Sequence, residues 1–146
     1  KLIKKVTRIF PIIFSTNIST RKLGDNQPTF DSLIMDEAGQ CENAYAIVAM
    51  SKAKRATLVG DPNQLLPVVT ISDSSNSKLR MQYSIPDFYD YKKTSILNTM
   101  NQVDFSNELL LLKKLYRCKK TIIDFSNKKY YGISFKIQKV KNYNEE

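Results

Sequence analysis

Two short apolar stretches, each followed by polar side chains, constrain the fold of this chain more than any other feature. Phe30–Met35 leads into Asp36 and Glu37, and Ala56–Val59 leads into a turn at 60–64. Both stretches have the length and apolar content of buried strands. In an open parallel α/β sheet, ligands bind outside the carboxyl ends of the strands. We therefore predict a polar site where these two strands end.

The residues between the two stretches predict how the strands are joined. Glu42–Met50 has the spacing of a helix, with Ala44, Ile47 and Val48 on one face. A strand, a helix and a second strand within so short a segment indicate a parallel βαβ unit. The expected fold class is therefore α/β, with a parallel sheet and flanking helices.

The rest of the chain predicts further helices, strands and loops around this unit. Before residue 92 we expect the end of a helix at 1–8, a strand at 9–14, a loop at 17–29, a mobile loop at 71–78 and an irregular packed segment at 81–91. A helix should then run from Thr94 or Ser95 to Gln102, with Ile96, Leu97 and Met100 facing inward. After it we expect a buried strand at 108–115, a helix at 119–131 ended by Gly132, and a strand at 134–140. The aromatic residues of 81–91 are compatible with base stacking, but packing within the protein explains them as well.

The composition excludes several kinds of site. The chain has no histidine, which excludes Ser-His-Asp and Cys-His nucleophilic catalysis and histidine metal sites. Its two cysteines, Cys41 and Cys118, provide neither a disulfide framework nor a four-ligand zinc site. Any chemistry must therefore use carboxylates, arginine, lysine or a metal bound by carboxylates.

Charge and hydropathy restrict the partners and the setting. The net charge is +9, from 23 Lys and Arg against 14 Asp and Glu, which favours polyanionic partners such as nucleic acid. An A/T-rich coding sequence explains so many lysines and asparagines equally well. No apolar run approaches the ~20 residues that cross a bilayer, so no membrane partner is expected. The few cysteines fit a reduced setting, cytoplasmic or nuclear, rather than secretion.

The strand-end residues have the chemistry of a nucleotide-hydrolysing site. Asp36 is suited to bind Mg²⁺, and Glu37 to deprotonate an attacking water. Gln64 can hydrogen-bond a γ-phosphate, whereas Asp61 can hold either its own loop or the water. Arg117 can stabilise charge in phosphoryl transfer. Each feature alone is also explained as an ordinary turn or a surface ion pair.

Considered together, the motifs resemble those of a superfamily 1 helicase. The residues concerned are Asp-Glu-Ala-Gly-Gln at 36–40, Gly-Asp-Pro-Asn-Gln-Leu-Leu-Pro-Val-Val at 60–69 and Tyr-Arg at 116–117, in this order and spacing. The branch that includes the nonsense-mediated-decay RNA helicase and the replication helicase-nucleases is the most similar. The resemblance extends from about Phe10 to Gly132.

This resemblance implies an ATP-dependent helicase or translocase with two RecA-like domains, ATP between them and a single strand of DNA or RNA across them. It assigns Asp36 to Mg²⁺, Glu37 to general-base catalysis and Gln64 to coupling of the γ-phosphate to strand binding. It places Tyr116 on the adenine and Arg117 at the γ-phosphate.

The same resemblance implies further contacts and a domain boundary. Asp61 is expected at the nucleotide, and Ser15, Thr16 and Pro67 at the nucleic acid. Residues 1–107 would form the distal part of the first RecA-like domain. Residues 108–146 would form the interdomain strand and the start of the second domain, so the rest of the helicase core is an expected partner.

The chain departs from the family pattern at several positions. Leu66 stands where many relatives have proline, Leu115 where glutamine is usual, and Lys119-Lys120 where His-Pro is usual. The 146 residues contain no Gly-x-x-x-x-Gly-Lys-Ser/Thr phosphate loop, which the family has upstream of the aspartate motif. We therefore expect an internal piece of a larger helicase that is inactive alone.

Two alternatives remain open. A helicase remnant that binds nucleic acid or a partner helicase without turnover would explain the missing phosphate loop and the basic charge. Another P-loop phosphotransferase would explain the acid at the strand end, but it does not account for the Gly-Asp-Pro-Asn-Gln stretch or the Tyr-Arg pair.

Overall fold

The computed structural model describes residues 2–24, 28–103, 110–112, 114–115, 120–132 and 136–137. The chain divides into two compact units, Lys1–Phe105 and Ser106–Glu146, and each is described by itself. The boundary between the units lies close to the one expected after residue 107. The identity of the units as parts of two RecA-like domains stays a prediction.

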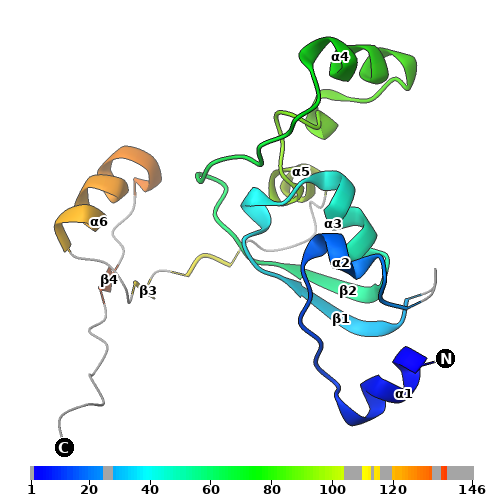
Figure 1. Ribbon diagram of the computed structural model, residues 1–146. Coiled ribbons are helices and arrows are strands. Elements are labelled where there is room, and N and C mark those ends of the chain that lie inside the picture. Colours follow the sequence, from blue (N-terminus) through cyan, green and yellow to red (C-terminus); the bar gives the residue numbers. More distant parts are fainter. Residues whose placement is uncertain are drawn as a thin grey trace, which may run out of the picture. The chain divides into compact units, whose positions relative to one another are not determined.

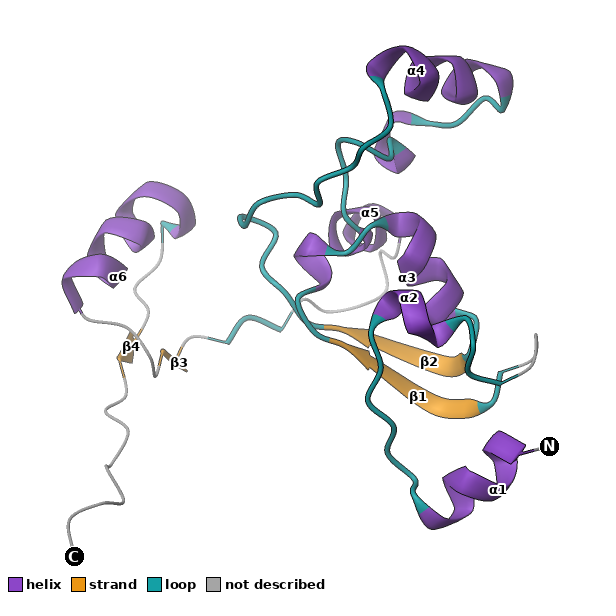
Figure 2. Ribbon diagram, viewed as in Figure 1, coloured by secondary structure: helices purple, strands orange, loops and turns teal. Residues whose placement is uncertain are grey.

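A parallel two-stranded sheet positions the candidate site in the first unit. β1 (Phe30–Met35) pairs with β2 (Ala53–Leu58) from Phe30 opposite Ala53 to Met35 opposite Leu58. Helix α3 (Asn43–Met50) makes the connection between them. Figures 1 and 2 show α3 and the short helix α2 (Asn17–Thr20) on one face of the sheet. The predicted βαβ unit and the α/β fold class are confirmed.

The core lies between this sheet face and the helices. In β1, Met35 is buried and Leu33 packs against the core, whereas Ile34 points the other way and is 73% exposed. This alternation follows from the period of two along a strand. The buried apolar cluster consists of Met35, Ala38, Ala46, Ala49, Ile96 and Leu97.

Helix α3 is confirmed, but the apolar face noted in the sequence is not the face that the helix buries. Ala46 and Ala49 are buried, whereas the predicted residues Ala44, Ile47 and Val48 are exposed. The small alanine side chains let the helix backbone approach the sheet closely, and the larger side chains lie on the outer face.

The predicted strand at 9–14 is wrong. Helix α1 (Leu2–Ile9) takes its first residue, and Phe10, Ile12 and Phe14 are 64%, 73% and 94% exposed in a segment without regular structure. A strand requires a hydrogen-bonded neighbour, and the described residues form no ladder with this segment. Pro11 also has no N–H to donate.

The polar segment at 17–29 is not entirely a loop. It begins with a short helix, α2 (Asn17–Thr20), in which the backbone N–H groups of Ser19 and Thr20 donate to the Thr16 carbonyl at 3.0 and 3.2 Å. Thr16 precedes the helix in an extended conformation, as helix-capping residues do.

The expected mobile loop at 71–78 is also wrong. Helix α4 (Asp73–Gln82) occupies it, and the Ser72 hydroxyl caps the helix by accepting from the Ser75 N–H at 3.1 Å. Asp73 in the first turn and Arg80 in the last complement the helix dipole. The serines and aspartate that suggested a loop are therefore a helix start. A 3₁₀ turn, η2 (Asp87–Tyr89), follows within the predicted irregular segment.

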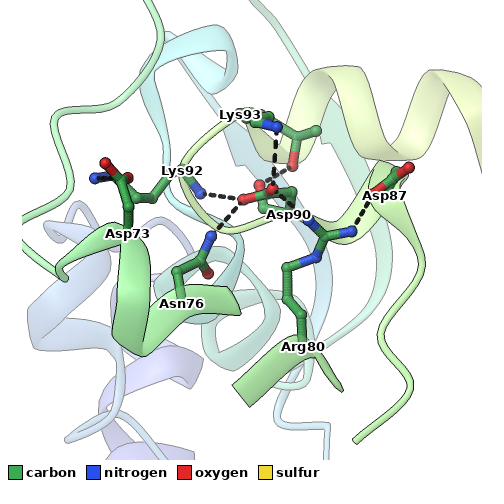
Figure 3. A network of polar contacts seen from close by, with 8 residues as sticks. Asp73, Asn76, Arg80, Asp87, Asp90, Lys92 and Lys93 are labelled. Atoms are coloured by element: carbon green, nitrogen blue, oxygen red, sulfur yellow. Dashed lines mark hydrogen bonds and ion pairs between the residues drawn. The ribbon is translucent and has the colours of Figure 1, made fainter. Parts of the chain in front are cut away.

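A buried carboxylate joins α4 to the following segment (Figure 3). Asp90 is 1% exposed and accepts hydrogen bonds from Asn76 and Arg80 of α4, both at 2.8 Å. The Lys92 backbone N–H donates to the same carboxylate at 3.0 Å. Arg80 also pairs with Asp87. These contacts tie α4 to residues 87–92 through charge-assisted hydrogen bonds.

Helix α5 (Ile96–Val103) confirms the predicted capping and the predicted inward face. The Ser95 hydroxyl accepts from the Asn98 N–H at 3.2 Å, and Ile96 and Leu97 are buried. The Ile96 backbone N–H donates to the Cys41 carbonyl at 3.0 Å, which joins α5 to the loop after Glu37.

The second unit contains short elements. β3 (Lys114–Leu115) pairs in parallel with β4 (Lys136–Ile137), which lies within the predicted strand at 134–140. Helix α6 (Lys120–Ser126) continues into a π turn, Asn127–Tyr131, and Gly132 ends it with φ +60°, as predicted. Of the predicted buried strand at 108–115, residues 114–115 form β3, but residues 110–112 have no regular structure and Leu110 and Leu112 are 84% and 71% exposed, so the prediction is wrong there.

Candidate functional site at the sheet edge

The candidate site is built from two turns, and the first site turn, residues 36–40, follows directly from β1. The Asp36 carboxylate accepts from the Glu37 backbone N–H at 3.0 Å, and both side chains are exposed. Glu37 has left-handed backbone angles, φ 53° and ψ 37°, and precedes a 3₁₀ turn, η1 (Ala38–Gln40). A non-glycine residue in this conformation carries strain of the kind that clusters at functional sites.

The second site turn, residues 60–64, follows β2 and is held in place by its own Asp61. The Asp61 carboxylate accepts from the Asn63 N–H at 2.9 Å, and the Asp61 carbonyl accepts from the Gln64 N–H at 3.3 Å. This is the turn chemistry of aspartate. The structure therefore gives Asp61 contacts that hold its own loop, and its role at the nucleotide stays a prediction.

Two glycines bring these turns into backbone contact. A Cβ added at Gly39 would lie 2.6 Å from the Asp61 carbonyl oxygen, and one at Gly60 would lie 2.8 Å from the Gly39 nitrogen. The Ala38 N–H donates to the Val59 carbonyl at 2.8 Å, which continues the sheet pairing into the site. Neither turn can therefore shift alone.

Gly39→Ala should cost about 1–3 kcal/mol of stability, because its methyl group would overlap the backbone of the second turn. Hydrogen exchange of peptides covering residues 36–64 measures this locally, and we expect faster exchange in the variant. Gly132→Ala is the control for a glycine replacement elsewhere: its φ of +60° disfavours a side chain, but it lies in the other unit, so exchange of 36–64 should stay as in wild type. Equal protection of 36–64 in wild type and Gly39→Ala would contradict the prediction.

A side-chain hydrogen bond also joins the two turns. Gln40 Nε2 donates to Gln64 Oε1 at 2.8 Å. Asp36, Glu37, Asp61 and Gln64 thus lie on two interlocked turns at the carboxyl ends of paired strands. The sequence motifs contained Gln40 but gave it no role, and its resemblance to Gln64 as an amide after a strand-end acid was the available signal.

The residues expected at the nucleic acid lie on two different loops. Ser15 and Thr16 are exposed and directly precede α2, where Asn17 Nδ2 donates to Cys41 Sγ at 3.0 Å. This contact joins the start of α2 to the loop after Glu37. Pro67 is half-buried in the segment that follows the second turn.

Cys41 is held as a thiol beside the first turn. Burial, together with the nearby charge of Glu37, raises the pKa of Cys41 more than the hydrogen bond from Asn17 lowers it. A thiolate is the reactive form of cysteine, so this environment favours a structural role.

Two of the predicted site residues cannot be placed at the site. Tyr116 and Arg117 lie outside the described residues. In the described ranges, no cluster of three or more His, Cys, Asp or Glu side chains could hold a metal ion. The same ranges contain no helix that is long and apolar enough to cross a membrane.

Fold and site together define an α/β domain with acid and amide groups at the ends of parallel strands. In sequence, residues 1–72 match a family model described as an AAA domain. Over 103 residues the chain is 35% identical to Helicase sen1 of Schizosaccharomyces pombe. This matched stretch makes up 70% of this chain and 5% of the relative. Over 50 residues it is 46% identical to Helicase SEN1 of Saccharomyces cerevisiae. That stretch makes up 34% of this chain and 2% of the relative. The predicted resemblance to a superfamily 1 helicase is confirmed, and both of these relatives are Sen1 helicases.

Proposed function

We propose that the chain is part of an ATP-dependent helicase that couples Mg-ATP hydrolysis to movement along single-stranded DNA or RNA. The contact between the two strand-end turns carries this proposal, because it gathers one acid pair and one amide at a single sheet edge. The similarity to Sen1 helicases supports it. The chain spans only 5% and 2% of those relatives, so the activity of the whole protein is part of the proposal.

The donor set at the first turn fits Mg²⁺ better than it fits an all-protein metal site. Mg²⁺ keeps several waters and is held by one or two carboxylates together with substrate phosphates. The exposed Asp36 carboxylate at the end of β1 provides such a ligand. When bound, the ion would neutralise charge on the phosphates.

Glu37 and Gln64 are proposed to act on the attacking water and on the γ-phosphate, respectively. Glu37 is proposed to accept the proton of the attacking water, and its side chain is exposed to solvent. Gln64 donates to a γ-phosphate oxygen. Asp61 keeps the Gln64 turn in place, and Tyr116 and Arg117 are proposed contacts of the adenine and the γ-phosphate.

A strand of nucleic acid is the proposed partner of Ser15, Thr16 and Pro67. The net charge of +9 favours such a polyanion. The 146 residues contain no phosphate-loop motif, so we propose that they do not hydrolyse ATP unaided and act with the rest of a helicase core, in the cytoplasm or the nucleus.

ATP turnover by the natural gene product that carries this chain tests the proposal. We expect turnover that requires Mg²⁺ and rises when single-stranded RNA or DNA is added. Binding of the strand that weakens steeply with salt, without any turnover, would instead establish the non-catalytic remnant. Comparison of RNA with DNA of the same sequence identifies the preferred strand.

A further inference from the structure

We propose that Gln40 is a positioning residue that fixes the orientation of the Gln64 side-chain amide toward the γ-phosphate. This inference rests on the proposed function and adds a residue to which the helicase motifs assign no role. Its starting point is the 2.8 Å hydrogen bond from Gln40 Nε2 to Gln64 Oε1.

Both partners of this hydrogen bond stand on fixed backbone. The Gln40 N–H donates to the Glu37 carbonyl at 2.9 Å, and the Gln64 N–H donates to the Asp61 carbonyl at 3.3 Å. The glycine next to Gln40 packs against the same Asp61 carbonyl. The separation of the two side chains is therefore set by backbone packing, although both side chains are exposed.

The chemistry of a primary amide explains why orientation matters. The amide has an acceptor oxygen on one side and a donor NH₂ on the other. Phosphate oxygens only accept hydrogen bonds at neutral pH, so Gln64 must present Nε2 to ATP. With Oε1 engaged by Gln40, the two N–H bonds of Nε2 remain to donate. The reversed amide would instead present an oxygen to a negatively charged phosphate.

Gln40 also links this orientation to the catalytic base. It lies on the same 3₁₀ turn that Glu37 begins, whereas Gln64 follows the other strand. A displacement of the Glu37 turn would therefore change the hydrogen bond that orients Gln64. The assignment differs from that of a general structural role, because it acts only through the Gln64 amide.

Two substitutions in the natural gene product separate these roles. Gln40→Met keeps the length of the side chain but removes the donor, and Gln40→Glu replaces the donor with an acceptor that attracts Nε2. We expect kcat for strand-stimulated ATP turnover to fall about tenfold in Gln40→Met, the size of one neutral hydrogen bond, and further in Gln40→Glu. For Gln40→Met, the affinity for ADP, which lacks the γ-phosphate that Gln64 contacts, and the melting temperature should match the wild type.

A double-mutant cycle provides the decisive readout. In a Gln64→Ala background, Gln40→Met should have no further effect on kcat, because the amide that it orients is gone. An equal loss in both backgrounds, or wild-type kcat in Gln40→Met, would overturn the positioning role while the helicase activity stands. A wild-type protein without strand-stimulated turnover would overturn the proposed function and this role with it.

Discussion

Glu37→Gln should lower ATP turnover by the natural gene product at least about 100-fold, the contribution typical of a general base. Glutamine has nearly the same shape as glutamate but cannot take a proton from water. The left-handed turn at Glu37 accepts either residue equally, so the fold should not change. Steady-state turnover with saturating strand measures the loss, and affinity for a non-hydrolysable ATP analogue should stay within about twofold of wild type.

Glu42→Gln is the matched control for this prediction. Glu42 lies on the segment that follows the same turn, and its carboxylate accepts from the Tyr91 hydroxyl rather than facing the strand ends. That hydrogen bond, followed by burial, raises the pKa of Tyr91 to about 12, so the phenol stays protonated and keeps donating to Glu42 at neutral pH. The control should retain near wild-type turnover. If Glu37→Gln did so as well, another residue would have to be the base.

Asp90→Ala should release α4 from the first unit, at a cost of about 3 kcal/mol. The change removes a buried carboxylate and leaves the Asn76 amide buried without its acceptor. Hydrogen exchange of peptides from Asp73–Gln82 should accelerate about 100-fold, since each 1.4 kcal/mol corresponds to a factor of ten.

Asp73→Ala is the control that distinguishes the loss of the buried Asp90 carboxylate from the loss of an exposed one in α4 itself. Asp73 pairs with Lys92 at 2.6 Å, but its side chain is 91% exposed, and such pairs contribute little. Exchange in α4 should therefore change little in this control. A similar acceleration in both variants would show that any loss of charge loosens α4, contrary to the role assigned to Asp90.

The stabilisation by Asp90 should also depend on pH. Burial alone would raise the pKa of Asp90, but the hydrogen bonds from Asn76 and the Lys92 backbone, with the charges of Arg80 and Lys93, lower it below 3.8. A carboxyl group whose folded pKa is depressed stabilises the fold above its unfolded pKa, and this contribution is lost as the pH falls through the folded pKa. The effect of Asp90→Ala on exchange should therefore diminish in acid.

The parts of the fold that could be predicted are those with a strong local pattern. β1 begins and ends at the predicted residues because an apolar run ends there in two acids, and Ser95 caps α5 as its position before an apolar helix face indicates. α4 was missed because serine and aspartate suit both loops and helix starts. The strand at 9–14 was wrong because its apolar composition does not supply a pairing neighbour.

The strand-end placement of the candidate site could be predicted, but its internal contacts could not. Parallel pairing of the strands brings the two turns to one edge, as their order in the chain implies. The hydrogen bond from Gln40 to Gln64 depends on the close approach of Gly39 and Gly60, which no local pattern specifies. The buried face of α3 could not be recognised for a similar reason. Its small residues, Ala46 and Ala49, pack closely on the sheet, whereas the larger Ile47 and Val48 are exposed.

The parallel pairing of β1 with β2 has a consequence for how the protein folds. Residues 30–58 contain both strands and the helix between them, so the pairing closes only a short stretch of chain. Short closures lose little chain entropy and are fast relative to long-range pairings. We therefore expect the two site turns to come together early in synthesis and folding, before α5, which is more distant in sequence, packs into the core.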